Sequence, residues 1–286
     1  MSTEEALRRC GVSAELTRTS AMGGGDISEA FRVETSDGPL FLKTHPDADF
    51  AVEAESLDLL RSACTLMRVP LVLGFTSASA GAPAALALEL IPRGRPGPDF
   101  EERFAEGLAE LHRATAPSFG LEFDTWCGSS SQPNGMLDTW SAFFAERRIA
   151  HQARLMERAG RISGRERRVF ESVAARIPDW VPEPDRPALI HGDLWSGNIL
   201  CDDSGRPCII DPAAYYGTSE AELGMITLFG GLSARFYDAF AGASGLAPDW
   251  REREPLYRLY HVMNHSTLFG GGYTAQAMQL ARGLPQ

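Results

Sequence analysis

The sequence predicts an α+β protein with two lobes, because the first ninety residues hold several short apolar strands and the remainder is mainly helical. A proline- and glycine-rich run at residues 92–98 separates these two regions, and these residue types mark breaks in regular structure. We therefore predict a strand-rich lobe over residues 1–91 and a mainly helical lobe over residues 92–286. A ligand-binding cleft is expected between them.

The strand-rich lobe is predicted to contain two helices. Ser2 and Glu5 fit a capping box that opens a short helix at the amino end. Residues 51–63 are rich in Ala, Glu and Leu, and they place Leu57 and Leu60 on one helical face. Four apolar stretches predict strands, at residues 30–35, 39–43, 69–74 and 84–91.

The helical lobe is predicted to begin with a helix capped by Asp99 and Glu102 that runs through Arg113. Two further helices are expected at residues 140–160 and 165–177. The pattern then changes to β-like pieces around an Asp-Asp-Ser-Gly turn, before helices return. These pieces lie at residues 188–190, 198–201 and 208–210.

The composition argues against several classes of protein. The net charge of −11 disfavours a nucleic-acid-binding protein, because phosphate backbones need a basic surface. No apolar stretch is long enough to cross a bilayer, and the amino end lacks the features of a signal peptide. The five cysteines are widely spaced with no Cys-x-x-Cys pair, which favours reduced, buried thiols. We expect a cytoplasmic protein without nucleic-acid or membrane partners.

These β-like pieces predict a small hairpin, and three polar side chains around it carry the main chemical signal. Asp193 follows an apolar strand, Asn198 stands five positions later, and Asp211 closes the next strand. Phosphoryl transfer uses one carboxylate to accept the proton of the attacking hydroxyl, while an amide and a second carboxylate hold Mg²⁺ against ATP. The kinase pattern H-R-D-x-x-x-x-N, then D-F-G, has the same Asp-to-Asn spacing, with Gly192 here in place of Arg. Singly these are ordinary loop residues, but together they predict Asp193 as catalytic base and Asn198 and Asp211 as metal ligands.

A lysine and a glutamate form a second pattern. Lys43 ends an apolar strand, ten residues before Glu53 on the following predicted helix. In kinases a strand lysine contacts the α- and β-phosphates of ATP and a helix glutamate orients it. A lone lysine at a strand end is usually surface charge, and Glu55 is a rival partner, so this pattern gains its weight from the Asp193 loop.

Two further segments are expected near the nucleotide. Residues 23–28 read Gly-Gly-Gly-Asp-Ile-Ser, and a glycine turn between strands lets the backbone N–H groups of Gly24 and Gly25 approach phosphates. The turn completes neither a Walker A loop nor G-x-G-x-x-G, so a plain hairpin turn is the alternative.

The second segment, Glu89, Leu90 and Ile91, lies between an apolar strand and the proline-rich run. This is where a kinase hinge would offer backbone groups to adenine.

Other chemistries have less support. His261 and His265 are four residues apart and could share a helix face for a metal, but no Glu of an H-E-x-x-H motif lies between them. No G-x-S-x-G elbow is present for a serine hydrolase. Glu220 and Glu222 could act as an acid–base pair, yet carboxylates are ordinary at helix starts.

The sequence resembles the fructosamine kinase (ketosamine-3-kinase) family over nearly its whole length. The most specific matches are Leu-Trp-Ser-Gly inside the loop of residues 191–198 and Asp-Pro-Ala-Ala-Tyr-Tyr-Gly at residues 211–217. Aminoglycoside and choline kinases share H-G-D-x-x-x-x-N but usually not this combination. Further matching segments lie at residues 132–135, 143–148, 228–231, 264–265 and 269–273.

The resemblance implies a protein-kinase-like fold that binds ATP with Mg²⁺ in its cleft. It implies phosphorylation of the 3-hydroxyl of a ketosamine, free or protein-bound, after which the adduct decomposes and the amine is deglycated. It favours Glu53 over Glu55, because the family glutamate stands four residues before the helix leucine, here Leu57. The residues that it places beside the substrate are Trp195, Tyr216 and Glu222, with core packing as the alternative for Trp195.

Two departures from the family pattern stand out. Asp26 in the glycine turn would bring negative charge near the ATP phosphates, and Gly224 stands where relatives usually have Ala. Neither removes a predicted catalytic group. The alternatives to a ketosamine kinase are a phosphotransferase for another hydroxyl, of the aminoglycoside or choline kinase kind, and a catalytically silent nucleotide-binding scaffold.

Overall fold

The computed structural model describes residues 1–23, 28–79 and 81–285. Within the first ninety residues it places one antiparallel five-stranded sheet with the order β1-β2-β3-β5-β4. The strands are β1 (Leu16–Met22), β2 (Glu29–Thr35), β3 (Gly38–His45), β4 (Val72–Thr76) and β5 (Ala84–Glu89). β3 and β5 are neighbours, so the strand that carries Lys43 pairs with the one that leads to the linker.

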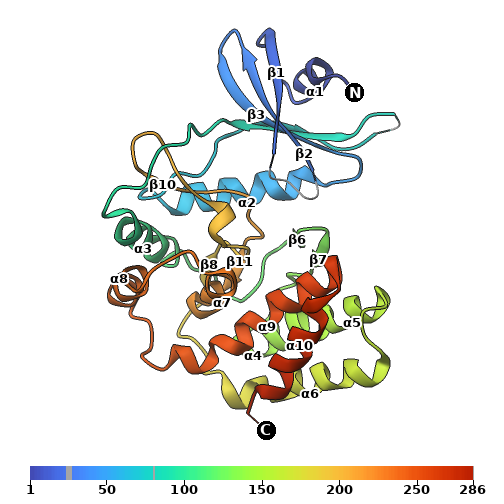
Figure 1. Cartoon of the computed structure of the whole chain (residues 1–286), viewed down its shortest axis with the longest axis vertical. Coiled ribbons are helices and arrows are strands. Elements are labelled where there is room, and N and C mark those ends of the chain that lie inside the picture. Colours follow the sequence, from blue (N-terminus) through green and yellow to red (C-terminus); the bar gives the residue numbers. More distant parts are fainter. Residues whose placement is uncertain (24–27, 80, 286) are drawn as a thin grey trace.

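Two helices accompany the sheet, as predicted. In α1 (Thr3–Arg9), the Ser2 side chain accepts the backbone N–H of Glu5, which is one half of the expected capping box. In α2 (Phe50–Ala63), the Asp49 side chain caps the first turn and the buried face includes Leu57 and Leu60. α2 lies between the sheet and the helical lobe (Figure 1). Its position allows one helix to contact both lobes.

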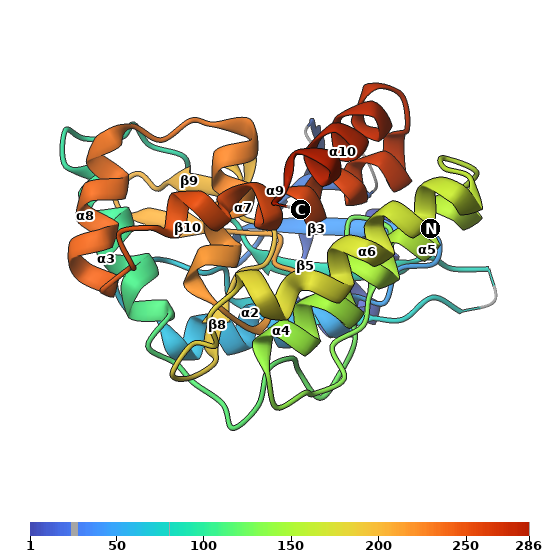
Figure 2. The same ribbon diagram turned by 90° about the horizontal axis from the view of Figure 1, so that it is seen from below.

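The rest of the chain is mainly helical. α3 and α8 pack together at one end of this lobe, and α5, α6 and α10 lie at the other (Figure 2). The helices are α3 (Phe100–Leu111), α4 (Trp140–Phe143), the π-helix η1 (Phe144–Ala150), α5 (His151–Arg158), α6 (Gly164–Trp180), α7 (Ser219–Phe229), α8 (Ala234–Ser244), α9 (Trp250–Phe269) and α10 (Gly272–Gly283). The helix predicted at residues 140–160 is therefore present, with a π-helical segment in its middle.

Short strand pairs are set among these helices. The predicted hairpin is β9 (Ile199–Cys201) with β10 (Pro207–Ile209), and it follows the short 3-10 helix η2 (Ser196–Asn198). The predicted strand β8 (Ala188–Ile190) pairs with β11 (Tyr215–Gly217), and β6 (Thr125–Cys127) pairs with β7 (Ser130–Gln132). We did not predict β6, β7 or β11, because three-residue strands leave almost no period in a sequence.

The capping box predicted for α3 is wrong. Asp99 occupies the N-cap position, but its side chain makes no capping hydrogen bond. Glu102 instead pairs with Arg235 on α8. A full capping box occurs at α6, where Ser163 and Glu166 bond reciprocally.

The apolar core continues across the predicted lobe boundary at residue 91, which itself stays a prediction. One buried cluster joins Leu57 and Leu86 of the strand-rich lobe to Phe104 and Phe236 of the helical lobe. The two lobes therefore share buried apolar surface as well as the linker.

Polar contacts add a second attachment, which we call the lobe clamp and define as residues 65–68 with their partners. Glu110 on α3 accepts the backbone N–H groups of Thr65 and Leu66, at 2.9 and 2.8 Å. The guanidinium of Arg206 donates to the carbonyl oxygen of Met67 at 3.0 Å. The N–H of Arg68 bonds to the carbonyl of Pro207 at 2.8 Å, and the N–H of Ile209 bonds back to Arg68 at 3.0 Å.

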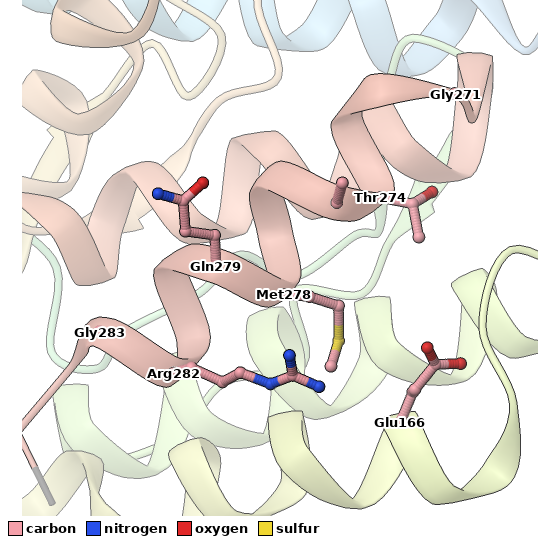
Figure 3. A pocket seen from close by; sticks show the side chains of 8 residues that line it. Glu166, Gly271, Thr274, Met278, Gln279, Arg282 and Gly283 are labelled. Carbon is pink, nitrogen blue, oxygen red and sulfur yellow. The ribbon is translucent and has the colours of Figure 1, made fainter.

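All five cysteines are buried and free, as the sequence predicted. Among the described residues, no helix is both long and apolar enough to span a bilayer. An open hollow of about 790 Å³ lies beside α10, where Met278 and Arg282 point toward Glu166 on α6 (Figure 3). Its lining includes none of the residues that the sequence assigned to a site.

Candidate active site

The loop at residues 191–198 begins where β8 ends, and its second position fits only glycine. Gly192 has φ of +81°, and a Cβ there would lie 2.2 Å from the carbonyl oxygen of Ala213. Glycine alone avoids both the backbone strain and this contact. The arginine of the H-R-D pattern has no room here, which explains why the sequence reads His-Gly-Asp.

His191 is fully buried and ties the loop to the strand that follows it. Its Nε2 lies 2.8 Å from the carbonyl oxygen of Ile210, and its Nδ1 accepts the N–H of Asp193 at 3.3 Å. These partners place the ring proton on Nε2. Burial lowers the pKa of His191, so the neutral ring acts as a structural tie.

Glu222 lies beneath the loop, which corrects its assignment to the substrate. Its side chain on α7 is buried and accepts the backbone N–H groups of His191 at 2.6 Å and Gly192 at 3.1 Å. Its Oε2 also lies 3.6 Å from Nε2 of His112. The carboxylate therefore holds the loop from inside the helical lobe, and it has no free face for a bound sugar.

Asp193 follows these anchored residues and carries a perturbed carboxyl group. Burial, together with the nearby carboxylates of Asp211 and Glu222, raises the pKa of Asp193 to about 7. Hydrogen bonds from Cys127 and Asn198 act in the opposite direction. A carboxylate with a pKa near neutrality can accept a proton from a hydroxyl group more readily than an ordinary aspartate.

Asn198 and Asp211 offer oxygen ligands beside Asp193. The Asn198 amide nitrogen donates to the backbone oxygen of Asp193 at 2.8 Å, so its Oδ1 is turned away from the loop backbone. Asp211 has φ of +55°, and it is the one non-glycine residue with positive φ in the described part of the chain. Aspartate tolerates this left-handed conformation better than most residues, and such outliers are concentrated at functional sites.

Lys43 connects the sheet to this loop. Its Nζ lies 2.8 Å from Oε1 of Glu53 on α2 and 2.6 Å from Oδ1 of Asp211. Burial would lower the pKa of Lys43, but the two carboxylates outweigh burial and raise it. Lys43 therefore stays charged. The rival partner Glu55 instead lines a hollow with Asp58 and Leu59 of the same helix.

The two segments expected near the nucleotide are only partly described. Gly24 and Gly25 lie outside the described residues. Glu89 ends β5, and its carboxylate pairs with Arg68 and accepts the N–H of Leu71. Leu90 and Ile91 follow directly, with Ile91 buried. The hinge role of residues 89–91 stays a prediction.

Trp195 is not a core residue, because 37% of its surface is exposed. A Cβ on Gly197 would lie 2.4 Å from the Trp195 ring, so the Trp-Ser-Gly sequence lets the indole lie across the loop. The ring centroid of Trp195 is 5.7 Å from that of Phe229. An aromatic surface therefore begins two residues after Asp193.

We did not predict how far this aromatic surface extends. From Phe229 it continues to His265 at 5.1 Å, and from His265 to Phe269 at 5.8 Å and Tyr273 at 5.1 Å. Phe229 and Phe269 are 41% and 52% exposed. The aromatic row, as we call this surface, consists of Trp195, Phe229, His265, Phe269 and Tyr273. Their sequence segments were part of the family resemblance, but nothing in the spacing showed that the rings meet.

Tyr216 does not join the aromatic row. Its side chain lines a hollow of about 530 Å³ with residues of α2 such as Asp58 and Leu59. Its neighbour Tyr215 is buried instead, with its ring 4.0 Å from the guanidinium carbon of Arg148. Tyr215 and Tyr216 face opposite ways because they are neighbours on β11, and the placement of Tyr216 beside the substrate stays a prediction.

The site now has a base candidate, two candidate oxygen ligands and a lysine–glutamate pair where a five-stranded sheet meets a helical lobe. This fold and this set of groups define a phosphotransferase of the protein-kinase-like class. The model of the fructosamine kinase family matches residues 2–284. The chain belongs to the fructosamine kinase family.

Relatives and solved structures agree with this membership. A probable ketoamine kinase of Synechocystis is 38% identical over 265 residues, covering 92% of this chain and 88% of that protein. A chloroplastic protein-ribulosamine 3-kinase of Arabidopsis thaliana is 34% identical, covering 94% and 83%. The crystal structure of a presumed fructosamine-3-kinase of Thermobifida fusca matches with a TM-score of 0.85 and 35% identity, covering 98% and 96%.

The fold extends beyond the family. An aminoglycoside phosphotransferase in complex with ADP and hygromycin B matches with a TM-score of 0.68 at 15% identity, covering 98% of this chain and 96% of that one. At this identity the similarity shows the shared fold alone.

Proposed function

We propose that this protein transfers the γ-phosphoryl group of ATP to the 3-hydroxyl of a ketosamine, a sugar joined to an amine as a ketoamine. The single observation that carries the proposal is the meeting of Asp193, Asp211 and Lys43 at the junction of the lobes, in a chain of the fructosamine kinase family. Relatives named ketoamine kinase and protein-ribulosamine 3-kinase support the ketosamine as acceptor.

Asp193 is the proposed base. The substrate hydroxyl oxygen forms a bond to the γ-phosphorus as the bond to ADP breaks, and the hydroxyl proton passes to the Asp193 carboxylate. Because Gly192 and Glu222 fix the loop backbone, the carboxylate is held ready for this step and needs little reorganisation. Such a base contributes roughly 10²–10⁴-fold in rate.

Asn198 and Asp211 are the proposed Mg²⁺ ligands. An amide oxygen turned away from the backbone and a partly exposed carboxylate are hard oxygen donors, which suit this ion. When bound, Mg²⁺ neutralises charge on the phosphates. Asn198 and Asp211 would orient it from one side of the site, and the strained backbone of Asp211 fixes the direction of its carboxylate.

Lys43 and Glu53 are the proposed phosphate pair. The Lys43 ammonium is held by Glu53 on α2, so its direction depends on the position of that helix. The lysine would contact the α- and β-phosphates of ATP, with the backbone of Gly24 and Gly25 and the segment Glu89–Ile91 as the remaining proposed nucleotide contacts.

The aromatic row is the proposed wall of the acceptor site, with Trp195 nearest to the base. Exposed aromatic rings bind the apolar faces of sugars and the stems of amines. Decomposition of the phosphorylated product would release the free amine, which gives the protein its proposed role in deglycation. We expect a cytoplasmic enzyme, although the Arabidopsis relative is chloroplastic by name.

A screen of acceptors with ATP and Mg²⁺ tests the proposal. Purified protein should consume ATP with ribulosyl-, fructosyl- or erythrulosyl-lysine, and the product should carry phosphate on the sugar O3 by ³¹P and ¹³C NMR. Turnover only with aminoglycosides or choline would replace the ketosamine with another hydroxyl. Turnover unchanged in Asp193→Asn would remove Asp193 from the role of base.

A further inference from the structure

The aromatic row continues well beyond the place where a sugar must lie to react. It begins at Trp195, two residues after the proposed base, and its far end is formed by Phe269 and Tyr273. Two ring-to-ring steps lie between, of 5.7 Å from Trp195 to Phe229 and 5.1 Å from Phe229 to His265. A sugar ring is no wider than an aromatic side chain, so a sugar beside Trp195 leaves the far end for another part of the acceptor.

We propose that Phe269 and Tyr273 determine specificity for the amine part of the ketosamine, by binding an extended apolar stem such as the side chain of lysine. The preferred acceptors are therefore ketosamines of long-chain amines, and ketosamines of short amines are poorer acceptors. The inference rests on the proposed ketosamine kinase function and on the proposed place of the sugar beside Trp195.

The chemistry of a ketosamine sets the order of its parts along the row. The reacting hydroxyl is on C3 of the sugar, whereas the amine nitrogen is bonded to C1 and carries the stem on its other side. With the C3 hydroxyl at Asp193 and the sugar beside Trp195, the nitrogen and its stem extend away from the base. The apolar surface that continues from Trp195 runs through Phe229 to Phe269, so the stem follows it.

The far end offers uncharged apolar surface. Phe269 is the most exposed ring of the row, at 52%. Neighbouring rings are inclined to each other by 45–59°, so no parallel partner covers their faces. Burial lowers the pKa of His265, whose Nδ1 lies 2.8 Å from the carbonyl oxygen of His261, so its ring stays neutral. Such a surface binds methylene groups, each of which favours binding as it leaves water.

The turn between α9 and α10 fixes the far end. α9 ends at Phe269, and the glycines at residues 270–271 have φ of +66° and +58°, a conformation that favours glycine. α10 then packs against α9, and the ring of Tyr273 lies 6.3 Å from that of Phe269. The hydroxyl groups of Ser266 and Thr274 bond at 2.6 Å between the same two helices. The two rings are therefore held in place before a stem binds.

A series of N-alkyl ketosamines with one sugar and linear stems from methyl to hexyl tests the inference. We measure kcat and KM for each acceptor with ATP, and the affinity of each acceptor without ATP by calorimetry. Phe269→Ala removes the most exposed ring, and Phe269→Leu keeps an apolar group there. Phe75→Ala is the matched control, because Phe75 is a 43% exposed phenylalanine on β4 of the sheet.

We expect kcat/KM to rise about two- to fourfold with each added methylene, through a lower KM, while kcat changes less than about twofold. Phe269→Ala should lower kcat/KM about tenfold for the hexyl acceptor and less than about threefold for the methyl acceptor. Phe269→Leu should recover the hexyl value to within about threefold of the native protein, and Phe75→Ala should keep both values. Tm should change by less than about 2 °C in each variant, since both side chains are exposed.

Three results would overturn the inference: a kcat/KM that does not change with stem length, a loss in Phe269→Ala that is equal for methyl and hexyl acceptors, or the same selective loss in Phe75→Ala. The binding data separate this inference from the proposed function. If ketosamines are phosphorylated without any dependence on the stem, only the role of Phe269 and Tyr273 fails.

The opposite outcome is also distinguishable. If no ketosamine is phosphorylated, yet the hexyl compound binds more tightly than the methyl compound and Phe269→Ala removes that difference, the proposed function fails and the stem-binding surface remains. If no ketosamine is phosphorylated and none binds, both fail together.

Discussion

Glu222→Gln is the sharpest test of how the loop is held. The native carboxylate accepts two backbone N–H groups, from His191 at 2.6 Å and Gly192 at 3.1 Å. A glutamine has one acceptor oxygen, so its NH₂ group must face one of these donors. One buried N–H then loses a charged acceptor, at a cost of about 1.5–3 kcal/mol.

This cost predicts two measurements. For a chain of this size, about 1 kcal/mol corresponds to about 2–4 °C in Tm, so Glu222→Gln should lower Tm by about 3–12 °C. The rate should also fall, because the displaced loop carries Asp193. Circular dichroism melting and the acceptor assay measure both quantities.

Glu106→Gln is the matched control, since Glu106 is an exposed glutamate on α3. It should change Tm by less than about 2 °C, as ordinary surface substitutions do. A Glu222→Gln protein with native Tm and native kcat would refute the argument that these two hydrogen bonds hold the loop.

Three further predictions concern other contacts. Lys43→Met should lower kcat/KM for ATP about 10²–10³-fold, as removal of one charge-stabilising group does, and a native value would exclude the phosphate contact. Gly192→Ala should destabilise the protein by about 2–4 kcal/mol in urea unfolding, since φ is +81° and Ala213 blocks a Cβ; unchanged unfolding would contradict the steric argument. Burial raises the pKa of Glu110, but hydrogen bonds from Thr65 and Leu66 outweigh it and lower the pKa from 4.5 to about 2. The stability that the Glu110 carboxylate gives to the fold is therefore full above pH 4.5 and is lost as pH falls toward 2. Because Glu110 is partly exposed, we expect Glu110→Gln to be less stable than the native protein by only about 1–2 kcal/mol at pH 7, with the difference vanishing near pH 2 in melts across pH.

The contact between Lys43 and Glu53 was only partly predictable from the sequence. The two residues are ten apart on adjacent elements, but the spacing left Glu55 as a rival partner, and the family resemblance favoured Glu53. The Asp193 loop was also predictable, because its two ends are strands whose apolar residues show in the sequence. The direct contact of Lys43 with Asp211 depends on how the lobes pack, and no local pattern indicates it.

Glu222 shows what sequence reasoning missed. The family resemblance placed it beside the substrate, and it is close to the site along the chain. Its side chain faces inward because this part of α7 is buried. For Tyr216, the register of β11 with β8 sets the side to which the ring faces, and no local pattern indicates that register.

The lobe clamp has a mechanical consequence. The strand-rich lobe is joined to the helical lobe by the linker, where the N–H of Gly94 bonds to the carbonyl of Cys201, and again through Arg68 to the neighbouring strand β10. Both of these contacts lie on the β9–β10 hairpin, while Glu110 and the shared apolar core hold the lobes together at further points. The contact between Lys43 and Asp211 therefore depends on attachments that lie outside the site itself.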